Sequence, residues 1–474
     1  MKVVSLKQLV YFCSFLSSFF IVGCQQQDQQ IEKSNSDPST AYSSKYQLNE
    51  DEPPFVIEHA TILTGTGKRF DDTSILVEKG RIKLIGKNFY VPPAVTRYDA
   101  DGQWVTPGLI DVHSHLGVYS SPHIESSEDG NEMSSPNTAE VWAEHSVWTQ
   151  DPGMPLALAG GVTTFQVLPG SANLFGGRGV TLKNVYARSV YDMKFPNAPQ
   201  SLKMACGENP KRVYGANGTA PSTRMGNVAG YRNAWVKASD YRQEWDEYYL
   251  AVEAGDEIQK PERDIQLDTL AEVLRGNILV HNHCYRAEEM LVMIEVAKEF
   301  GYQISAFHHA VEAYKVADIL AEQNICSAVW ADWWGFKHEA FDHVRENAAM
   351  LEKASACAII HSDSEIGIQH LNQEAAKAMA AGNKSGLDLK PKEVISWITS
   401  NAAKAIGIDD QTGTIEENKM ADIVIWSENP FSVYAKTNKV FIDGRLVYDR
   451  EDQKKQPTSD FELGILDPAE GRLR

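Results

Sequence analysis

Two histidines stand one residue apart at the end of an apolar run, His113 and His115 in the segment GLIDVHSHLG. Successive side chains of a β-strand point to opposite faces, so residues two apart point to the same face. If this segment is a strand, both imidazole rings face one site. Imidazole and carboxylate groups that meet in this way are typical ligands of zinc and related divalent metal ions.

Similar residues close three other apolar runs further along the chain. They are His281 with His283, His308 with His309, and His361 with Asp363. One histidine pair alone is weak evidence for a metal site, because packed or solvated pairs are more common. Four strand ends with such residues favour a metal site strongly. A carboxylate beside a metal ion can also transfer protons, which makes Asp363 the candidate catalytic residue.

The elements that must position these residues lie between residues 106 and 407. This part of the chain alternates apolar β-runs with helical patterns, which predicts parallel strands joined by crossover helices. About eight such runs in roughly 300 residues match the size of a TIM (β/α)8 barrel. The carboxyl ends of barrel strands meet at one face, so the histidines and Asp363 converge there. We therefore expect an α/β fold with the metal site at that face.

Shorter β-runs with glycine-bearing turns occupy residues 54–105 and 408–450. Each set alone has too few strands to bury a face. We expect one small, β-sandwich-like domain built from both ends of the chain, with the barrel inserted between them and residues 451–474 as a C-terminal tail.

Residues 1–24 have the pattern of an export signal. Lys2 and Lys7 precede an apolar stretch, and the tetrapeptide that ends at Cys24 resembles a bacterial lipobox, in which the cysteine is lipidated. Residues 25–53 are rich in Gln, Ser, Asn and Asp and predict a flexible tether. We expect an exported lipoprotein, held by lipid on Cys24 at the outer membrane and facing the periplasm; the alternative is an ordinary cleaved signal or a short anchor.

The net charge bears on nucleic-acid binding, and the cysteines bear on disulfide formation. A net charge of −19 without clustered Lys and Arg argues against nucleic-acid binding. Besides Cys13 and Cys24, the chain has four widely spaced cysteines without a CxxC motif. Buried thiols are one interpretation, and a disulfide between Cys206 and Cys284 in an oxidising compartment is the other.

Three segments together resemble the amidohydrolase superfamily of metal-dependent hydrolases. They are VTPGLIDVHSHLG, AGGVTTFQVLPG and TSNAAKAIGIDDQTGTIEENKMADIVIW. The most similar branches are the imidazolonepropionase-like and prolidase-like enzymes. The resemblance implies a barrel enzyme that cleaves a C–N bond in an amide or cyclic amide by metal-activated hydroxide, with Asp363 as general acid and base.

The resemblance also implies the metal ligands, for one or two divalent ions, of which zinc is the best candidate. They are His113, His115, His283, His309 and Asp363. His283 is preferred to His281 because HCYRAEEM matches the His-x-x-Arg-Ala segment of the family. The ligand on the fourth strand is either Glu208 or a carboxylated Lys203, and we favour Glu208 because it stands at the strand end.

Substrate contacts are expected from Arg178, Tyr285 and Arg286. Arg178 lies in the Gly-rich stretch 168–179, which lacks the Gly-Lys-Ser/Thr ending of a P-loop. As an active-face loop residue, Arg178 could clamp a substrate carboxylate, although a structural arginine is an equal alternative. The tryptophans of VWADWWGFKHE could line the pocket, with ordinary packing as the alternative.

These observations predict a metal-dependent hydrolase that acts on a small amide. A metallodipeptidase is the second candidate, and a lipoprotein that only binds a ligand is the candidate from another class. The complete set of candidate ligands favours an enzyme over a binding protein. The sequence leaves the substrate, the metal and a homo-oligomeric state open.

Overall fold

A computed structural model describes residues 43–48, 50–121 and 123–456. The described residues from 44 onward form one compact unit. The expected signal peptide, the tether as far as residue 42 and most of the C-terminal tail lie outside the described residues. No helix in the described part of the chain is both long enough and apolar enough to cross a membrane.

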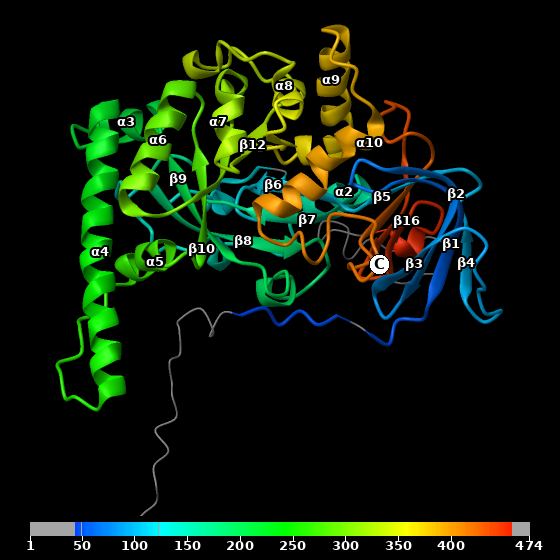
Figure 1. Ribbon diagram of the computed structural model, residues 1–474, viewed down its shortest axis with the longest axis horizontal. Helices are drawn as coiled ribbons and strands as arrows, with labels where there is room; N and C mark the ends of the chain where they lie inside the picture. Colours follow the sequence, from blue (N-terminus) through cyan, green and yellow to red (C-terminus); the bar gives the residue numbers. More distant parts are fainter. Residues whose placement is uncertain (1–42, 49, 122, 457–474) are drawn as a thin grey trace, which may run out of the picture. The chain divides into compact units, whose positions relative to one another are not determined.

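Eight strands follow one another in chain order across a barrel-like sheet (Figure 1). They are β6 (Leu109–Ser114), β7 (Val162–Val167), β8 (Phe175–Lys183), β9 (Gln200–Ala205), β10 (Ile278–His283), β11 (Ile304–His308), β12 (Cys326–Val329) and β13 (Cys357–Ile360). The sheet is nearly closed, because the N–H of Asp363, just after β13, donates to the carbonyl of His113 in β6 at 3.0 Å.

The expectation of an all-parallel barrel is wrong for one strand, β8. It runs antiparallel to both β7 and β9, whereas the other neighbouring strands are parallel. Residues 168–174 between β7 and β8 are too few for a crossover helix, so the chain turns back directly as a hairpin does. Most of the predicted Gly-rich loop is therefore part of a hairpin, and its second half is buried strand.

Helices connect the remaining strands. The α-helices are α2 (Gly153–Ala159), α3 (Glu208–Gly215), α4 (Arg224–Ala254), α5 (Ile265–Leu274), α6 (Ala287–Phe300), α7 (Ala317–Glu322), α8 (Asn347–Lys353), α9 (Leu371–Lys384), α10 (Pro391–Val394) and α11 (Ser400–Ala405). Short 3-10 helices are η1 (Glu125–Ser127), η2 (Ala143–His145), η3 (Val190–Asp192), η4 (Ala313–Val316), η5 (His338–Ala340), η6 (Gly367–His370), η7 (Ile395–Ile398) and η8 (Gln453–Lys455). The long helix α4 begins at a Thr223 cap and ends at Gly255, which has a φ of 84°.

A second sheet joins strands from both ends of the chain, drawn blue and red in Figure 1. Its strands are β1 (Phe55–Leu63), β2 (Arg69–Glu78), β3 (Arg81–Gly86), β4 (Thr96–Asp99), β5 (Trp104–Pro107), β14 (Ile423–Trp426), β15 (Thr437–Ile442) and β16 (Arg445–Asp449). The N-terminal and C-terminal strands meet where β5 pairs with β14. Hydrogen bonds connect all eight strands into one sheet. The sheet folds over on itself, because β1 and β15 are three places apart in the strand order and yet the rings of Phe55 and Phe441 stack at 4.7 Å.

A buried charge cluster ties the barrel to this sheet. Lys183 at the end of β8 has a fully buried side chain and pairs with Asp443 at 2.8 Å and with Asp422 at 3.5 Å. The hydroxyl of Tyr46 donates to Asp443, and the N–H of Lys45 donates to the carbonyl of Tyr191. The predicted tether is thus anchored to the folded part before residue 53.

Two disulfides link neighbouring barrel strands. Cys206 and Cys284, directly after β9 and β10, form one, and Cys326 and Cys357, at the starts of β12 and β13, form the other. The alternative of four buried thiols is therefore wrong. Strand neighbours bring together cysteines that are 78 and 31 residues apart in sequence.

Candidate active site

The histidines meet where β6, β10 and β11 end, beside the residues that follow β13. Two groups of side chains bring their ligand atoms within 4.8 Å of one another, the first formed by His113, His115 and Asp363 and the second by His113, His309 and His361. His113 belongs to both groups, so the two form one continuous cluster. Residues distant in sequence converge as the barrel interpretation predicts.

The carboxylate of Asp363 faces histidines on two sides. Its Oδ1 lies 3.1 Å from Nε2 of His115 and 3.4 Å from Nε2 of His113, and its Oδ2 lies 3.7 Å from Nε2 of His309. Asp363 and His309 have φ values of 50° and 55°, a left-handed conformation that is unfavourable for residues with a side chain. Such strain persists where the surroundings hold the residue, and it is common at functional sites.

The imidazoles are prepared to act as ligands rather than as cations. Burial lowers the pKa of His113 and of His309 well below 6.5, so both rings are neutral at pH 7 and keep a lone pair. Nδ1 of His115 donates to the carbonyl of Leu168 at 2.9 Å, which leaves Nε2 of this ring facing Asp363. Neutral imidazoles and a carboxylate fit a zinc-type divalent ion.

Lys203, not Glu208, lies against this cluster. The Nζ of Lys203 in β9 is 3.4 Å from Nε2 of His113, and burial lowers its pKa to about 7. Glu208 begins α3 and belongs to neither group of ligand atoms. Its carboxylate lies 3.7 Å from Nζ of Lys337. The geometry therefore does not support the preference for Glu208.

Aromatic rings surround the second side of the cluster. The ring centroid of His283 is 4.8 Å from that of His309 and 4.8 Å from that of Tyr285. Trp330 stacks on His309 at 4.5 Å and on Trp333 at 5.2 Å. Trp330 is buried and Trp333 is partly exposed, so the rings form a continuous wall from the cluster toward the surface.

Arg178 and Arg286, two of the three residues expected to contact the substrate, have other partners in the fold. Arg178 is a buried residue of β8 whose guanidinium donates to Thr269 at 2.8 Å and to Gln200 and stacks over Trp142. These contacts inside the fold favour the alternative of a structural arginine over that of a substrate clamp for Arg178. Arg286 precedes α6 and lies 3.9 Å from Glu288. Of the three candidates, Tyr285 is the one beside the histidines.

The sequence reasoning missed Asp111 and Ser362 as supports of the site. Asp111 in β6 accepts hydrogen bonds from the N–H of His113, the N–H of Ser362 and the hydroxyl of Ser362. Burial raises the pKa of Asp111 to about 7. Its period-two spacing before His113 and His115 was the available signal, because all three residues share one face of the strand.

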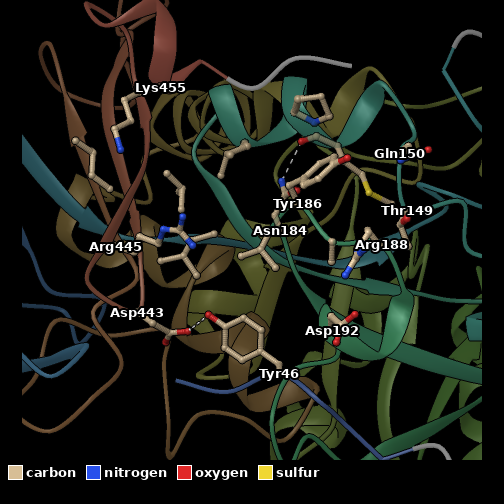
Figure 2. Close-up of a pocket in the computed structure, with 18 of the residues that line it drawn as sticks. Tyr46, Thr149, Gln150, Asn184, Tyr186, Arg188, Asp192, Asp443, Arg445 and Lys455 are labelled. Atoms are coloured by element: carbon tan, nitrogen blue, oxygen red, sulfur yellow. Dashed lines mark hydrogen bonds between the residues drawn. The ribbon is translucent and has the colours of Figure 1, made fainter. Parts of the chain in front are cut away.

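Figure 2 shows a separate cavity of about 850 Å³ lined by residues of α2, β15 and β16 and of the segments around Tyr46 and Tyr186. None of the candidate metal ligands lines it. Tyr46 donates to Asp443 at one side of this cavity. The cavity is therefore distinct from the histidine cluster.

A nearly closed α/β barrel with imidazoles and a carboxylate at its strand ends defines a class of hydrolase with a candidate metal centre. The pattern of the Amidohydrolase family matches residues 104–447. The amidohydrolase tasK of Hapsidospora irregularis is 32% identical over 395 residues, which cover 79% of this chain and 40% of that protein. An amidohydrolase structure from Thermotoga maritima superposes with a TM-score of 0.76 at 34% identity, covering 84% of this chain and all of that one.

An imidazolonepropionase of Fusobacterium nucleatum is 24% identical over 402 residues, which cover 79% of this chain and 91% of that protein. The family match extends over the barrel and over strands β5, β14 and β15 of the second sheet, and the Thermotoga structure covers 84% of this chain. The chain belongs to the amidohydrolase family, and it is a hydrolase that acts on carbon–nitrogen bonds.

Proposed function

We propose that the protein hydrolyses a C–N bond in a small amide or cyclic amide with a divalent metal ion, zinc being the best candidate. The observation that carries the proposal is the carboxylate of Asp363, whose two oxygens face Nε2 atoms of His113, His115 and His309. The names of the amidohydrolase and imidazolonepropionase relatives support this substrate class.

The residues that would hold the metal are His113, His115, His283, His309 and Asp363. A divalent ion supplies Lewis acidity, which polarises a carbonyl and lowers the pKa of water to about 7. Asp363 accepts the proton of the attacking water and returns it to the leaving nitrogen, because an amide anion is a very poor leaving group. Tyr285, beside His283, is the candidate contact to the substrate.

We propose further that Lys203 is the bridging ligand, in its carboxylated form. A neutral amine attacks CO₂, and the resulting carbamate carries a negative charge after loss of one proton. The buried amine has a pKa of about 7, so a substantial fraction is neutral at that pH. The distance of 3.4 Å between Nζ of Lys203 and Nε2 of His113 supports this proposal, because a carbamate formed on Nζ would lie beside the histidine cluster.

Metal content tests this assignment directly. We expect about two ions per chain in the wild type and in Glu208→Ala, and one or fewer in Lys203→Ala. The same preparations are assayed on N-acyl amino acids, dipeptides and cyclic amides. A wild type that binds no metal, or that binds it and cleaves none of these, would contradict the proposed function. Two ions in Lys203→Ala with fewer in Glu208→Ala would restore Glu208 as the bridge.

A dipeptide carries a carboxylate that an arginine could bind. The hydrogen bonds of Arg178 lie inside the fold, so they do not favour the dipeptidase alternative. The binding-lipoprotein alternative is disfavoured by membership of a hydrolase family. Faster cleavage of dipeptides than of other amides in the assay would nevertheless favour the dipeptidase.

We propose that the protein is exported and anchored by lipid on Cys24, and that it lies at the outer membrane and faces the periplasm. The two disulfides support an oxidising compartment, since disulfides are rare in reducing cytosol. Cell fractionation tests this proposal. We expect the wild type in the membrane fraction and Cys24→Ser in the soluble or unprocessed pool; a wild type found in the cytosol would contradict export.

A further inference from the structure

Three buried histidines form a hydrogen-bonded chain that ends at the candidate metal ligand His113. Nδ1 of His281 lies 2.8 Å from Nε2 of His308, and Nδ1 of His308 lies 2.9 Å from Nδ1 of His113. All three side chains are at most 1% exposed. Neither His281 nor His308 belongs to the groups of ligand atoms around Asp363.

A hydrogen bond between two of these rings needs a proton on one ring nitrogen and a lone pair on the other. A neutral imidazole has one donor nitrogen and one acceptor nitrogen. The protons of the three hydrogen-bonded rings can therefore be arranged in two ways. The tautomer of each ring determines that of its neighbour.

Metal binding is compatible with only one of these orders. A ligand bond from Nε2 of His113 requires the proton on Nδ1, which then donates to Nδ1 of His308. His308 in turn carries its proton on Nε2 and donates to Nδ1 of His281. In the opposite order Nε2 of His113 carries the proton and points toward Asp363, so it has no lone pair for a metal.

We propose that His308 and His281 are positioning residues that hold His113 in the tautomer and orientation required for metal binding. The inference rests on the proposed function, because it assumes a metal ion at Nε2 of His113. Ligating histidines generally donate their second ring N–H to an acceptor that fixes the ring, and in this chain an imidazole performs that role.

His281 stands at the end of the three hydrogen-bonded histidines, where the proton order that allows metal binding is unfavourable. Among the described residues, Nε2 of His281 has no hydrogen-bond partner. In the metal-binding order this nitrogen carries an unsatisfied buried N–H, which is unfavourable. The bond of His113 to the metal must offset that cost, so metal binding and the tautomers of all three rings are coupled.

A comparable contact supports His309. Nε2 of His361 lies 2.7 Å from Nδ1 of His309, whereas His115 donates to the backbone carbonyl of Leu168. Thus His113 and His309 each have a hydrogen bond to another imidazole, whereas His115 has a hydrogen bond to the backbone. Variants of His308 change the support of His113 and leave the hydrogen bond between His115 and Leu168 in place.

The experiment compares zinc affinity in His308→Gln and His308→Leu, measured on metal-free protein by competition with a chromophoric chelator. Glutamine can accept from His113 and donate to His281, whereas leucine can do neither. We expect 10- to 100-fold weaker zinc binding in His308→Leu and substantial recovery in His308→Gln. Ser327→Ala, another buried polar side chain of the barrel sheet, is the control and should bind zinc as the wild type does.

Nitrogen chemical shifts of ¹⁵N-labelled histidine give a readout that needs no variant to fold. We expect zinc to place the protons of His308 and His281 on Nε2. Zinc-loaded wild type with the His308 proton on Nδ1, or unchanged zinc affinity in a folded His308→Leu, would overturn the inference alone. Wild type that binds no zinc would overturn the proposed function and the inference together.

Discussion

At the scale of single residues, Asp363 has the most constrained position in the candidate site. Its backbone N–H closes the seam of the barrel on His113, and its two carboxylate oxygens face three histidines. One residue therefore combines a structural contact of its backbone with the two roles that we propose for its carboxylate, metal ligation and proton transfer.

Asp363→Asn keeps the shape of the side chain and removes its charge and its basic oxygen. We expect kcat/KM on the best amide of the assay panel to fall about 10²- to 10⁴-fold, the usual contribution of general acid–base catalysis. Asp318→Asn on the exposed side of α7 is the matched control and should retain activity. Retained activity in Asp363→Asn would exclude Asp363 as the proton carrier.

At the scale of elements, strand β8 has a structural rather than a catalytic role. Its reversed direction buries Arg178 among Thr269, Gln200 and Trp142. The sequence placed this arginine in a loop at the active face, because the glycines around it are typical of loops. Its hydrogen bonds instead connect β8 with β9 and α5.

Arg178→Met should lower stability and leave substrate binding unchanged. Loss of charged hydrogen bonds to the buried Thr269 and the partly buried Gln200 predicts about 1.5–3 kcal/mol less free energy of unfolding, measured by urea titration. Arg445→Met removes a side chain that is 71% exposed and should change stability by no more than about 0.5 kcal/mol. A raised KM with unchanged unfolding in Arg178→Met would revive the substrate clamp.

At the scale of the whole molecule, the barrel and the second sheet share the buried charges of Lys183, Asp422 and Asp443. The lysine comes from the barrel strand β8, and the aspartates flank strands of the C-terminal part of the sheet. Tyr46 adds the N-terminal segment to the same cluster. Barrel, sheet and N-terminal segment thus depend on one another for charge compensation.

Lys183→Met should destabilise the folded protein strongly, because it leaves two buried carboxylates without their cation. Removal of one partner of a buried pair predicts a loss of about 3–5 kcal/mol, measured by denaturant unfolding. Lys377→Met removes a half-exposed lysine with two acidic partners and should cost at most about 1 kcal/mol. Equal effects of the two substitutions would contradict a special role for Lys183.

The local pattern of the chain predicted the histidine site well for physical reasons. Period two in a strand places His113 and His115 on one face, and parallel strands bring their carboxyl ends to one edge. The sequence also offered a disulfide between Cys206 and Cys284 as one of two alternatives, on the ground of an oxidising compartment. It could not predict the pairing of Cys326 with Cys357, which depends on which strands become neighbours.

The sequence by itself determined the residue types at the strand ends, and with them the class of site and the family. Only the tertiary structure decided that Lys203 rather than Glu208 reaches the histidines, that Arg178 points into the fold, and that His308 connects His281 to His113. The physical reason is range: spacing along a strand is a local property, whereas the neighbours of a side chain depend on strand direction and on packing between segments that are distant in sequence.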